Sequence, residues 1–404
     1  MNSDKPHFNH LQITVFLFLF AHSTAGPDLE TTLNEKEIEK VMAGAEILGC
    51  GGGGTIESAH ELLEEVVQAG KKLRIQDVDS LPAQAVCSVV SGVGGGLSRI
   101  ELAKIRPYFT SKDNPSRLQT FIEAVRLLSN YTGEVHALLP SEIGAGNIIV
   151  PLATSAMLDI VTLDADCCGR AKPEIAISTT ALTRIKPTPM ALVSPFGEGI
   201  VVRKALDDVR AEQLARACAV ASGGRLACAR SPMQGHEVRE SVIRGSYSRA
   251  LEMGDKIVGA RERGKDLVEV LSHHFGFKEV FAGMVVEWVS RKAGAFLTGH
   301  LTITGEGVWK DRLMRIDFKN EYLVAFLDGL PYVTCPDLIT VVDRETQKPL
   351  SNWANTYTYL HKPVSVLYKK AADVWHTRAG LTLFSPLHFG YSFGYTNAID
   401  ANAQ

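Results

Sequence analysis

The stretch GCGGGGTIESAH, residues 49–60, places a run of glycines directly before a helix-forming segment. Gly49, Gly51 and Gly54 match the G-x-G-x-x-G pattern of dinucleotide-binding loops, and Asp77 lies downstream where a ribose-binding acid would sit. That fingerprint requires a strand before the glycines, because the pyrophosphate binds where a parallel strand gives way to a helix. The residues upstream of the loop therefore decide how this part of the chain folds.

The segment upstream of the glycines has the pattern of a helix. Its apolar residues recur at helical spacing at Ile38, Val41, Met42 and Ala45. Asn34 and Glu37 have the spacing of a capping box, which marks the N-terminus of a helix that reaches nearly to the glycines. Too few residues remain for a strand, so we reject the dinucleotide interpretation and expect no NAD cofactor.

A second helix is predicted after the loop, from Ser58 to Ala69, with Gly70 as its stop signal. Its N-terminus points at the loop, and free amide groups there attract an anion such as a carboxylate or a phosphate. The alternative is that the glycines let two helices pack closely without any ligand.

The composition is that of an ordinary globular protein of 404 residues, of which 45% are hydrophobic. A chain of this length is expected to form two domains. The formal net charge is −3, with acidic and basic residues mixed throughout, so we expect no nucleic-acid partner. The seven cysteines show no C-x-x-C spacing, which favours reduced thiols and a cytoplasmic protein.

The N-terminal segment LQITVFLFLFAHSTAG, residues 11–26, points to a different localisation. A short apolar core followed by small residues is typical of a secretory signal, and it is too short to span a membrane. The residues before it carry both Lys5 and Asp4, so they lack the positive excess of a signal peptide. We therefore interpret residues 1–32 as an extension of a cytoplasmic protein, with secretion through this segment as the alternative.

From about Leu33 to about Lys204, short apolar runs alternate with amphipathic helices, which predicts an α/β domain over residues 33–204. Strands are predicted at Leu73–Val78, Ala85–Val90, Glu134–Leu139, Ile160–Asp164 and Ile175–Thr180, and helices at Leu118–Leu128 and Ile148–Leu158. A second glycine cluster, Gly92 to Gly96, is predicted to form a loop after the Ala85–Val90 strand. The two glycine loops would then converge at strand ends, where open α/β sheets bind ligands.

The remaining residues, 205–400, are predicted to form a helical connection and then a β-rich C-terminal domain. Helices are predicted at Val209–Ser222, through Val238–Glu252, and at Asp266–His274. From Lys278 onward, runs such as VFAGMVVEWVS alternate with turn residues, which indicates antiparallel strands. The predicted fold class is thus α/β, with glycine-rich loops in the N-terminal domain.

The densest cluster of functional groups is TLDADCCGRAKPE, residues 162–174. Asp164, Asp166 and Glu174 lie close to Arg170 near a strand end, where such groups can hold a divalent metal, activate water or orient a polar heterocycle. The three acids are therefore the metal candidates. The alternative is structural, with a helix cap and an ion pair to Arg170; we favour function for the cluster as a whole.

A second candidate is LLPSEIGAGN, residues 138–147, in which a strand ends and a glycine-containing turn leads into an apolar helix. This places Glu142 and Asn147 near the mouth of the same sheet, where a carboxylate can act as a base and an amide can hold a carbonyl. In the alternative, Ser141 caps the helix and Glu142 only complements the helix dipole.

Cysteines and histidines give weaker signals. The adjacent Cys167 and Cys168 lack a zinc-ligand spacing and a nameable activating base, so neither a zinc site nor a nucleophile is favoured. His388 and the other scattered histidines are expected to be surface or packing residues.

Taken in order, the motifs resemble the S-methyl-thiohydantoin desulfurase-like family, whose members are often encoded near hydantoinases. The matching motifs are AGAEILGCGGGG, PSEIGAGN, LDADCCGRAKPE, TPMAL, VRESVIRGSYSRALEMG, NEYLVAFLDG, PDLITVVD and HFGY, from about Leu33 to Tyr391. The resemblance implies a two-domain enzyme that acts on a thiohydantoin-type ring, replacing an exocyclic sulfur by oxygen and releasing a thiol.

The resemblance also implies roles for individual residues. Asp166 would be the water-activating base or a metal ligand, with Asp164 and Glu174 as its partners, and Arg170 would hold the ring carbonyl. The substrate-orienting groups would be Glu142 and Asn147, and the backbone cradle would be Gly51, Gly52, Gly53 and Gly54.

Partners follow from the same resemblance. We expect a small heterocyclic substrate, a hydantoinase partner and a homo-oligomer. The alternative function is a non-catalytic accessory or ligand-binding subunit of a hydantoinase system; the acid cluster favours the enzyme.

Overall fold

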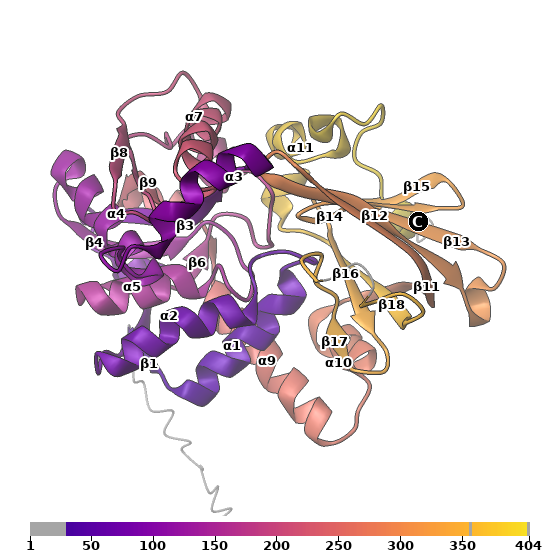
Figure 1. The fold of residues 1–404 in the computed structure, drawn as a ribbon. Helices are drawn as coiled ribbons and strands as arrows, with labels where there is room; N and C mark the ends of the chain where they lie inside the picture. Colours follow the sequence, from indigo (N-terminus) through magenta and orange to yellow (C-terminus); the bar gives the residue numbers. More distant parts are fainter. Residues whose placement is uncertain (1–29, 355–357, 402–404) are drawn as a thin grey trace, which may run out of the picture.

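The computed structural model describes residues 30–354 and 358–401, so the apolar signal-like segment lies outside the described residues. Two eight-stranded sheets form two domains (Figure 1). Together they give the α/β N-terminal domain and the antiparallel, β-rich C-terminal domain that were predicted. No helix in the described ranges has the length and apolar character needed to cross a membrane.

The first sheet has the order β1-β2-β5-β4-β3-β9-β7-β8. Its strands are β1 (Glu30–Leu33), β2 (Leu73–Gln76), β3 (Val86–Gly94), β4 (Val135–Pro140), β5 (Val161–Leu163), β7 (Met190–Val193), β8 (Gly199–Val202) and β9 (Arg225–Gln234). The four strands β2, β5, β4 and β3 are parallel, and the remaining neighbours pair antiparallel. β9 lies between β3 and β7 although it follows residue 204, so this sheet takes strands from both sides of that position.

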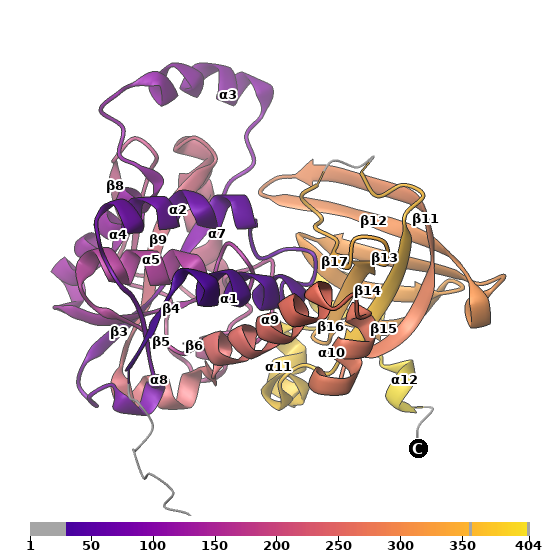
Figure 2. The same ribbon diagram turned by 90° about the horizontal axis from the view of Figure 1, so that it is seen from below.

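Helices cover both faces of the first sheet (Figures 1 and 2). One face packs against α1 (Glu35–Leu48), α2 (Ile56–Gln68), α4 (Arg117–Thr132) and α5 (Ile149–Leu158), and the other against α7 (Asp208–Ala221) and α8 (Gly235–Ser241). Side chains along β3 point alternately to the two faces of the sheet. Val90 belongs to the core on the first face, and Val89 and Val93 belong to the cores on the second. A strand buried on both faces is near-continuously apolar for this reason.

The helix before the glycines is confirmed. The Asn34 side chain accepts a hydrogen bond from the Glu37 amide (3.1 Å), and the Glu37 carboxylate accepts one from the Asn34 amide (2.8 Å). The helix then continues to Leu48, so no strand precedes the glycine loop. The context that a dinucleotide fingerprint requires is therefore missing.

Three sequence predictions are wrong. Residues 175–178 make turns that lead to α6 (Thr179–Leu182), because their backbone groups bond locally and to Glu212 rather than to a neighbouring strand. The glycine-rich segment after Val90 is not all loop, since β3 continues to Gly94 in register with β9. The helix predicted through Val238–Glu252 is two helices, α8 and α9 (Ser246–Glu262), because Gly245 has φ +72° and follows β10 (Ile243–Arg244).

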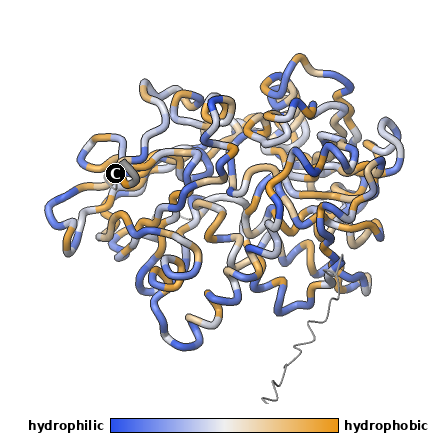
Figure 3. Tube along the Cα trace, turned by 180° about the vertical axis from the view of Figure 1, so that it is seen from behind, coloured by the Kyte–Doolittle hydropathy of each residue, from blue (hydrophilic) through white to orange (hydrophobic). Residues whose placement is uncertain are grey.

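The second sheet is antiparallel throughout, with the order β15-β14-β13-β12-β11-β18-β16-β17. Its strands are β11 (Lys278–Ala293), β12 (Phe296–Gly305), β13 (Leu313–Lys319), β14 (Glu321–Leu327), β15 (Leu330–Thr334), β16 (Leu338–Asp343), β17 (Lys348–Pro349) and β18 (Pro363–Lys369). Its core centres on Phe281, Trp288 and Tyr322. Hydrophobic residues concentrate in the strands, and many outer loops are hydrophilic (Figure 3).

The two domains are joined by α9, which crosses α1 before α10 (Leu267–Phe275) leads into β11 (Figure 2). The helices cross at backbone contact because Gly44 and Gly254 lie in the crossing. A Cβ on Gly44 would lie 2.0 Å from the Ala250 carbonyl oxygen, and one on Gly254 would lie 1.7 Å from the Lys40 carbonyl oxygen. This close crossing holds the glycine loop, which follows α1, against the second domain.

Candidate functional site

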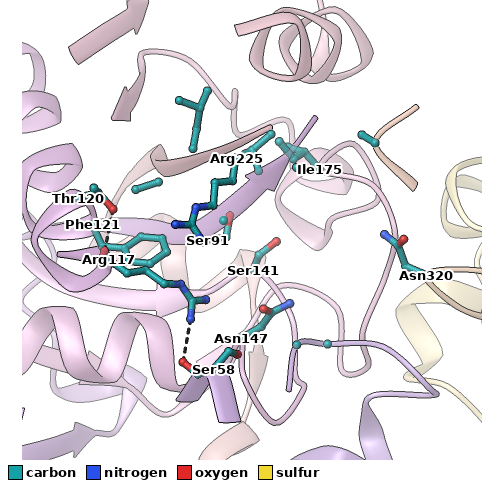
Figure 4. Close-up of a pocket in the computed structure, with 18 of the residues that line it drawn as sticks. Ser58, Ser91, Arg117, Thr120, Phe121, Ser141, Asn147, Ile175, Arg225 and Asn320 are labelled. Atoms are coloured by element: carbon teal, nitrogen blue, oxygen red, sulfur yellow. Dashed lines mark hydrogen bonds between the residues drawn. The ribbon is translucent and has the colours of Figure 1, made fainter. Parts of the chain in front are cut away.

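A cavity of about 830 Å³ lies between the two domains. The first domain contributes the glycine loop, the loop after β4, the segment after Arg170, and parts of α4 and β9; the second contributes Asn320, Glu321 and Trp353 (Figure 4). The cavity opens beyond the carboxyl end of the parallel strand β4, which is where α/β sheets place ligands.

Two glycine loops interlock at the cavity wall. The Gly53 carbonyl accepts hydrogen bonds from the amides of Gly146 (3.1 Å) and Asn147 (2.9 Å). A Cβ on Gly53 would lie 2.5 Å from the Gly144 Cα, and Gly53 also has φ +79°, so both crowding and conformation require glycine. The loops therefore fix each other's position.

The loop itself supplies only part of the predicted cradle. Gly53 and Gly54 line the cavity, at the N-terminus of α2. Gly51 and Gly52 do not line it, because they pack beneath Tyr322, Asn352 and Glu321. The predicted cradle is corrected to Gly53 and Gly54, and the inner pair of glycines serves contact between the domains.

Glu142 and Asn147, both predicted from the sequence, lie together at the cavity. The Asn147 side-chain amide donates to Glu142 Oε1 at 2.5 Å, and the Lys172 backbone amide donates to Glu142 Oε2 at 2.8 Å. Burial raises the pKa of Glu142 above its ordinary value, while the Lys172 charge and these hydrogen bonds oppose the rise. Glu142 is thus a buried carboxylate whose ionised form is hydrogen-bonded.

A second carboxylate, Glu321, enters the cavity from the other domain and was missed in the sequence. It is 3% exposed, and its Oε2 has no hydrogen-bond partner among the described residues. Burial, and then the charge of Glu142, raise its pKa well above the ordinary range. The pKa values of both carboxyl groups are thus raised by burial, and that of Glu321 is raised further by the charge of Glu142.

Lys172 also lines this part of the cavity. Its side chain is buried, and its Nζ donates to the Glu174 carbonyl oxygen at 3.1 Å. Burial, followed by the charge of Arg230, lowers the pKa of Lys172 below its ordinary value. A cation next to Glu142 stabilises the ionised carboxylate and any negative charge that develops on a ligand.

Glu174 lies at the cavity, but its carboxylate is occupied by two side chains of the second domain. Lys319 pairs with its Oε1, and His388 Nε2 lies 2.8 Å from its Oε2. Burial would raise the pKa of Glu174, but the His388 and Lys319 contacts outweigh it and lower the pKa to about 2. Glu174 therefore ties the domains together at the cavity rim.

Asp164 and Asp166 do not line the cavity, and their oxygens are used within the fold. Asp164 accepts from the Tyr247 amide (2.6 Å) and the Ser248 amide (3.2 Å), which caps the start of α9. Asp166 accepts from the Gly169 amide and the Ser246 hydroxyl, both at 2.6 Å, and is fully buried. Neither acid lines the cavity, and both carboxylates have hydrogen-bond partners within the fold, so their catalytic roles stay predictions.

Arg170 is likewise structural. Its side chain is fully buried and donates to backbone carbonyls on both sides of the domain joint, including those of Ala171 (3.0 Å) and Tyr322 (2.8 Å). It does not line the cavity, and its contact with a ring carbonyl stays a prediction. A buried guanidinium with its donors on carbonyls stabilises the joint between the domains.

The three predicted metal candidates do not lie together. Asp164 and Asp166 accept hydrogen bonds from residues at the start of α9, whereas Glu174 pairs with side chains of the second domain. Among the described residues, no group of three or more His, Cys, Asp or Glu side chains is placed to hold a metal ion. The seven cysteines are free thiols. Burial raises the pKa of Cys167 to about 12 and that of Cys168 well above its ordinary value, so both are protonated thiols at neutral pH.

The sequence did carry weak signals for the missed residues. Glu321 is an acid at the start of the apolar run EYLVAFL, and Lys172 lies inside the acidic cluster. A charged residue beside a fully buried run is a candidate for a buried functional group, because unpaired charges are seldom buried otherwise.

Two family models match the chain in succession: the S-Me-THD-like N-terminal domain over residues 36–204 and the S-Me-THD-like C-terminal domain over residues 206–398. Among solved structures, the crystal structure of a protein from Chromobacterium violaceum is similar to this chain, with a TM-score of 0.70 and 21% identity. The similarity covers 91% of this chain and 100% of that one, and it shows a shared fold. No curated protein matches the chain.

Proposed function

The chain belongs to the S-Me-THD-like family, and from that premise we propose that it hydrolyses the carbon–sulfur bond of an S-methyl-thiohydantoin-like ring in the cavity between its domains. The observation that carries the proposal is the pair of buried carboxyl groups, Glu142 and Glu321, which line one cavity and differ in proton affinity. An ionised base beside a protonated acid is what hydrolysis of an N=C–S group needs.

In the proposed reaction, Glu142 takes one proton from water as the water oxygen attacks the ring carbon that bears the sulfur. Glu321 donates its proton to the ring nitrogen as the carbon–nitrogen double bond becomes single. The hydroxyl proton of the intermediate then passes to Glu321, a carbonyl forms and the carbon–sulfur bond breaks. The thiolate takes the proton held by Glu142, so one water yields a hydantoin and a thiol and both carboxyl groups are restored.

Two neighbouring groups support this division of roles. Asn147 and the Lys172 amide hold Glu142 by hydrogen bonds of 2.5 and 2.8 Å, which fixes the direction of its lone pairs. The Lys172 ammonium lines the same wall and would stabilise negative charge that builds up on the ring in the transition state. Because a thiolate leaves readily, no further acid is required.

The test is a thiol-release assay with an S-methyl-thiohydantoin on the wild type, Glu142→Gln and Asp164→Asn. Glu142→Gln removes the base but keeps the side-chain shape, so we expect turnover to fall about 10²–10⁴-fold. Asp164→Asn is the matched control, because this acid caps α9 and lies off the cavity.

Each outcome has a distinct meaning. Loss of turnover in Asp164→Asn with full turnover in Glu142→Gln would move the reaction back to the acid cluster. If the wild type released no thiol, the accessory-subunit function would be favoured instead. Co-purification of the chain with a hydantoinase would then test that function.

A further inference from the structure

We propose that Arg117 and Arg225 form an anion-binding subsite in the cavity, and that the substrate is a thiohydantoin whose side chain ends in a carboxylate. This inference rests on the proposed function and names its substrate class. The two arginines lie across the cavity from Asn320, on the α4 and β9 side (Figure 4).

The cavity has room for more than a ring. At about 830 Å³ it is of the size that holds a drug-sized ligand, whereas a five-membered ring with one small substituent fills only part of it. The carboxyl pair occupies the wall near Asn147 and Asn320. The space toward Ser91 and Phe121 is therefore left for a substituent of the ring (Figure 4).

Arg117 is held in place with donors to spare. Its Nη1 donates to the Ser58 carbonyl oxygen at 2.8 Å and forms an ion pair with Glu61 Oε2 at 3.7 Å, and Glu61 also lines the cavity. Its guanidinium carbon lies 6.0 Å from the centre of the Phe121 ring. The Ser58 contact anchors one edge of the guanidinium and leaves nitrogen donors for a ligand.

Arg225 has no ion pair or side-chain hydrogen bond with any other residue that the structure describes, although it lines the cavity and pairs through its backbone with Gly94. Burial lowers the pKa of Arg117, the charge of Glu61 opposes this effect, and the charge of Arg225 lowers the pKa further. Glu61 balances the charge of Arg117, which leaves the charge of Arg225 for an anion in the cavity. A carboxylate matches the planar guanidinium fork, which binds it through two parallel hydrogen bonds.

A third arginine at the cavity shows the contrast. Arg216 is committed to Glu212 and to the carbonyl oxygens of Gly94 and Pro173, and its guanidinium carbon lies 4.1 Å from the Phe296 ring centre. A structural arginine in this cavity is therefore saturated with partners, unlike Arg225. Arg225 is exposed and lines the cavity, so its guanidinium is accessible to an anionic ligand.

The test measures binding by titration calorimetry, independently of turnover. The ligands are hydantoin-5-acetate and its uncharged isostere hydantoin-5-acetamide, and the proteins are the wild type, Arg225→Gln and Arg126→Gln. Arg126 is the matched control, because it lies on the same helix as Arg117 but pairs with Glu123 outside the cavity. Charge-assisted hydrogen bonds predict that the wild type binds the acetate about tenfold to a hundredfold more tightly than the acetamide.

Arg225→Gln is expected to remove most of this preference without changing the affinity for the acetamide, and Arg126→Gln to leave both affinities unchanged. Equal affinity of the wild type for the two ligands, binding of neither, or an undiminished preference in Arg225→Gln would overturn the subsite. Failure of the proposed reaction looks different: the acetate would bind with the expected preference, while its S-methyl-thio counterpart would release no thiol.

Discussion

The contact between the two glycine loops is the support on which the cavity rests, and we predict that Gly144→Ala breaks it. A Cβ on Gly144 would lie 2.2 Å from the Gly53 Cα and 2.4 Å from the Gly53 carbonyl oxygen. Both atoms are backbone and cannot rotate away, so one loop must move. Gly144 does not have a positive φ, so the cost is purely steric.

The expected cost lies at the upper end of the range for overpacking, about 2–3 kcal/mol. For a domain of this size, that cost lowers the midpoint of thermal unfolding by about 5–10 °C. The assay is thermal unfolding by calorimetry, together with titration of hydantoin-5-acetate, whose affinity should fall because Glu142 and Asn147 belong to the displaced loop.

Two controls separate the causes. Gly92→Ala adds a Cβ with no atom within 4 Å and an ordinary φ, so it should leave the midpoint nearly unchanged. Gly133→Ala adds a Cβ in open space at φ +80° and ψ −175°, a backbone region that glycine alone readily adopts, so it should cost about 1–3 kcal/mol through conformation alone. If Gly144→Ala were as stable as Gly92→Ala, the two loops would not be in contact and the account of the site would be wrong.

Three further predictions concern the carboxyl groups. The rate of thiol release should follow a bell-shaped pH profile, because it rises as Glu142 ionises at its raised pKa and falls as Glu321 ionises at a pKa raised further. Glu321→Gln should abolish the alkaline limb of this profile, and an unchanged limb would exclude Glu321 as the acid. The pKa of Glu174 is lowered to about 2, so its pairs stabilise the fold above the ordinary pKa of 4.5 and lose that effect as the pH falls toward 2. Urea titrations should therefore show Glu174→Gln less stable than the wild type by about 1–3 kcal/mol at pH 7 and equally stable near pH 2; a difference that persisted there would mean that packing, not charge, is lost. Asp166→Asn should lower the free energy of unfolding by about 1–3 kcal/mol without lowering kcat of the folded protein, and loss of kcat with intact stability would return Asp166 to the reaction.

Short-range sequence patterns predicted most of the fold. The capping pair Asn34 and Glu37 predicts the start of α1. The parallel strands follow from the alternation of apolar runs with amphipathic helices. Both patterns can be read from the sequence because they depend only on neighbouring residues. The strand β9 could not be foreseen in the same way, since Arg230 and Ser231 interrupt its apolar pattern. The buried Arg230 side chain donates to the Ser141 hydroxyl, from another strand end, at 2.7 Å and to the Ser231 hydroxyl at 3.1 Å.

The site was predictable only where it is built from one segment. Glu142 and Asn147 stand next to each other in the sequence pattern and lie together at the cavity. From the sequence alone, Asp164 and Asp166 look like site residues as Glu142 does. Nothing near them in the sequence reveals that they accept hydrogen bonds from residues in the first turn of α9. Glu321 reaches the cavity from another domain, and no pattern within either domain could pair it with Glu142.

Because β9 lies in the middle of the first sheet, the two halves of the chain cannot be separated at residue 204 without breaking that sheet. A chain that ended at residue 204 would lack the strand that joins β3 to β7, so the β7–β8 hairpin would lose its only link to the sheet within the described residues. The first half would then present two unpaired strand edges and invite aggregation. The two halves are therefore expected to be exchanged, duplicated or lost as a single genetic unit rather than shuffled separately.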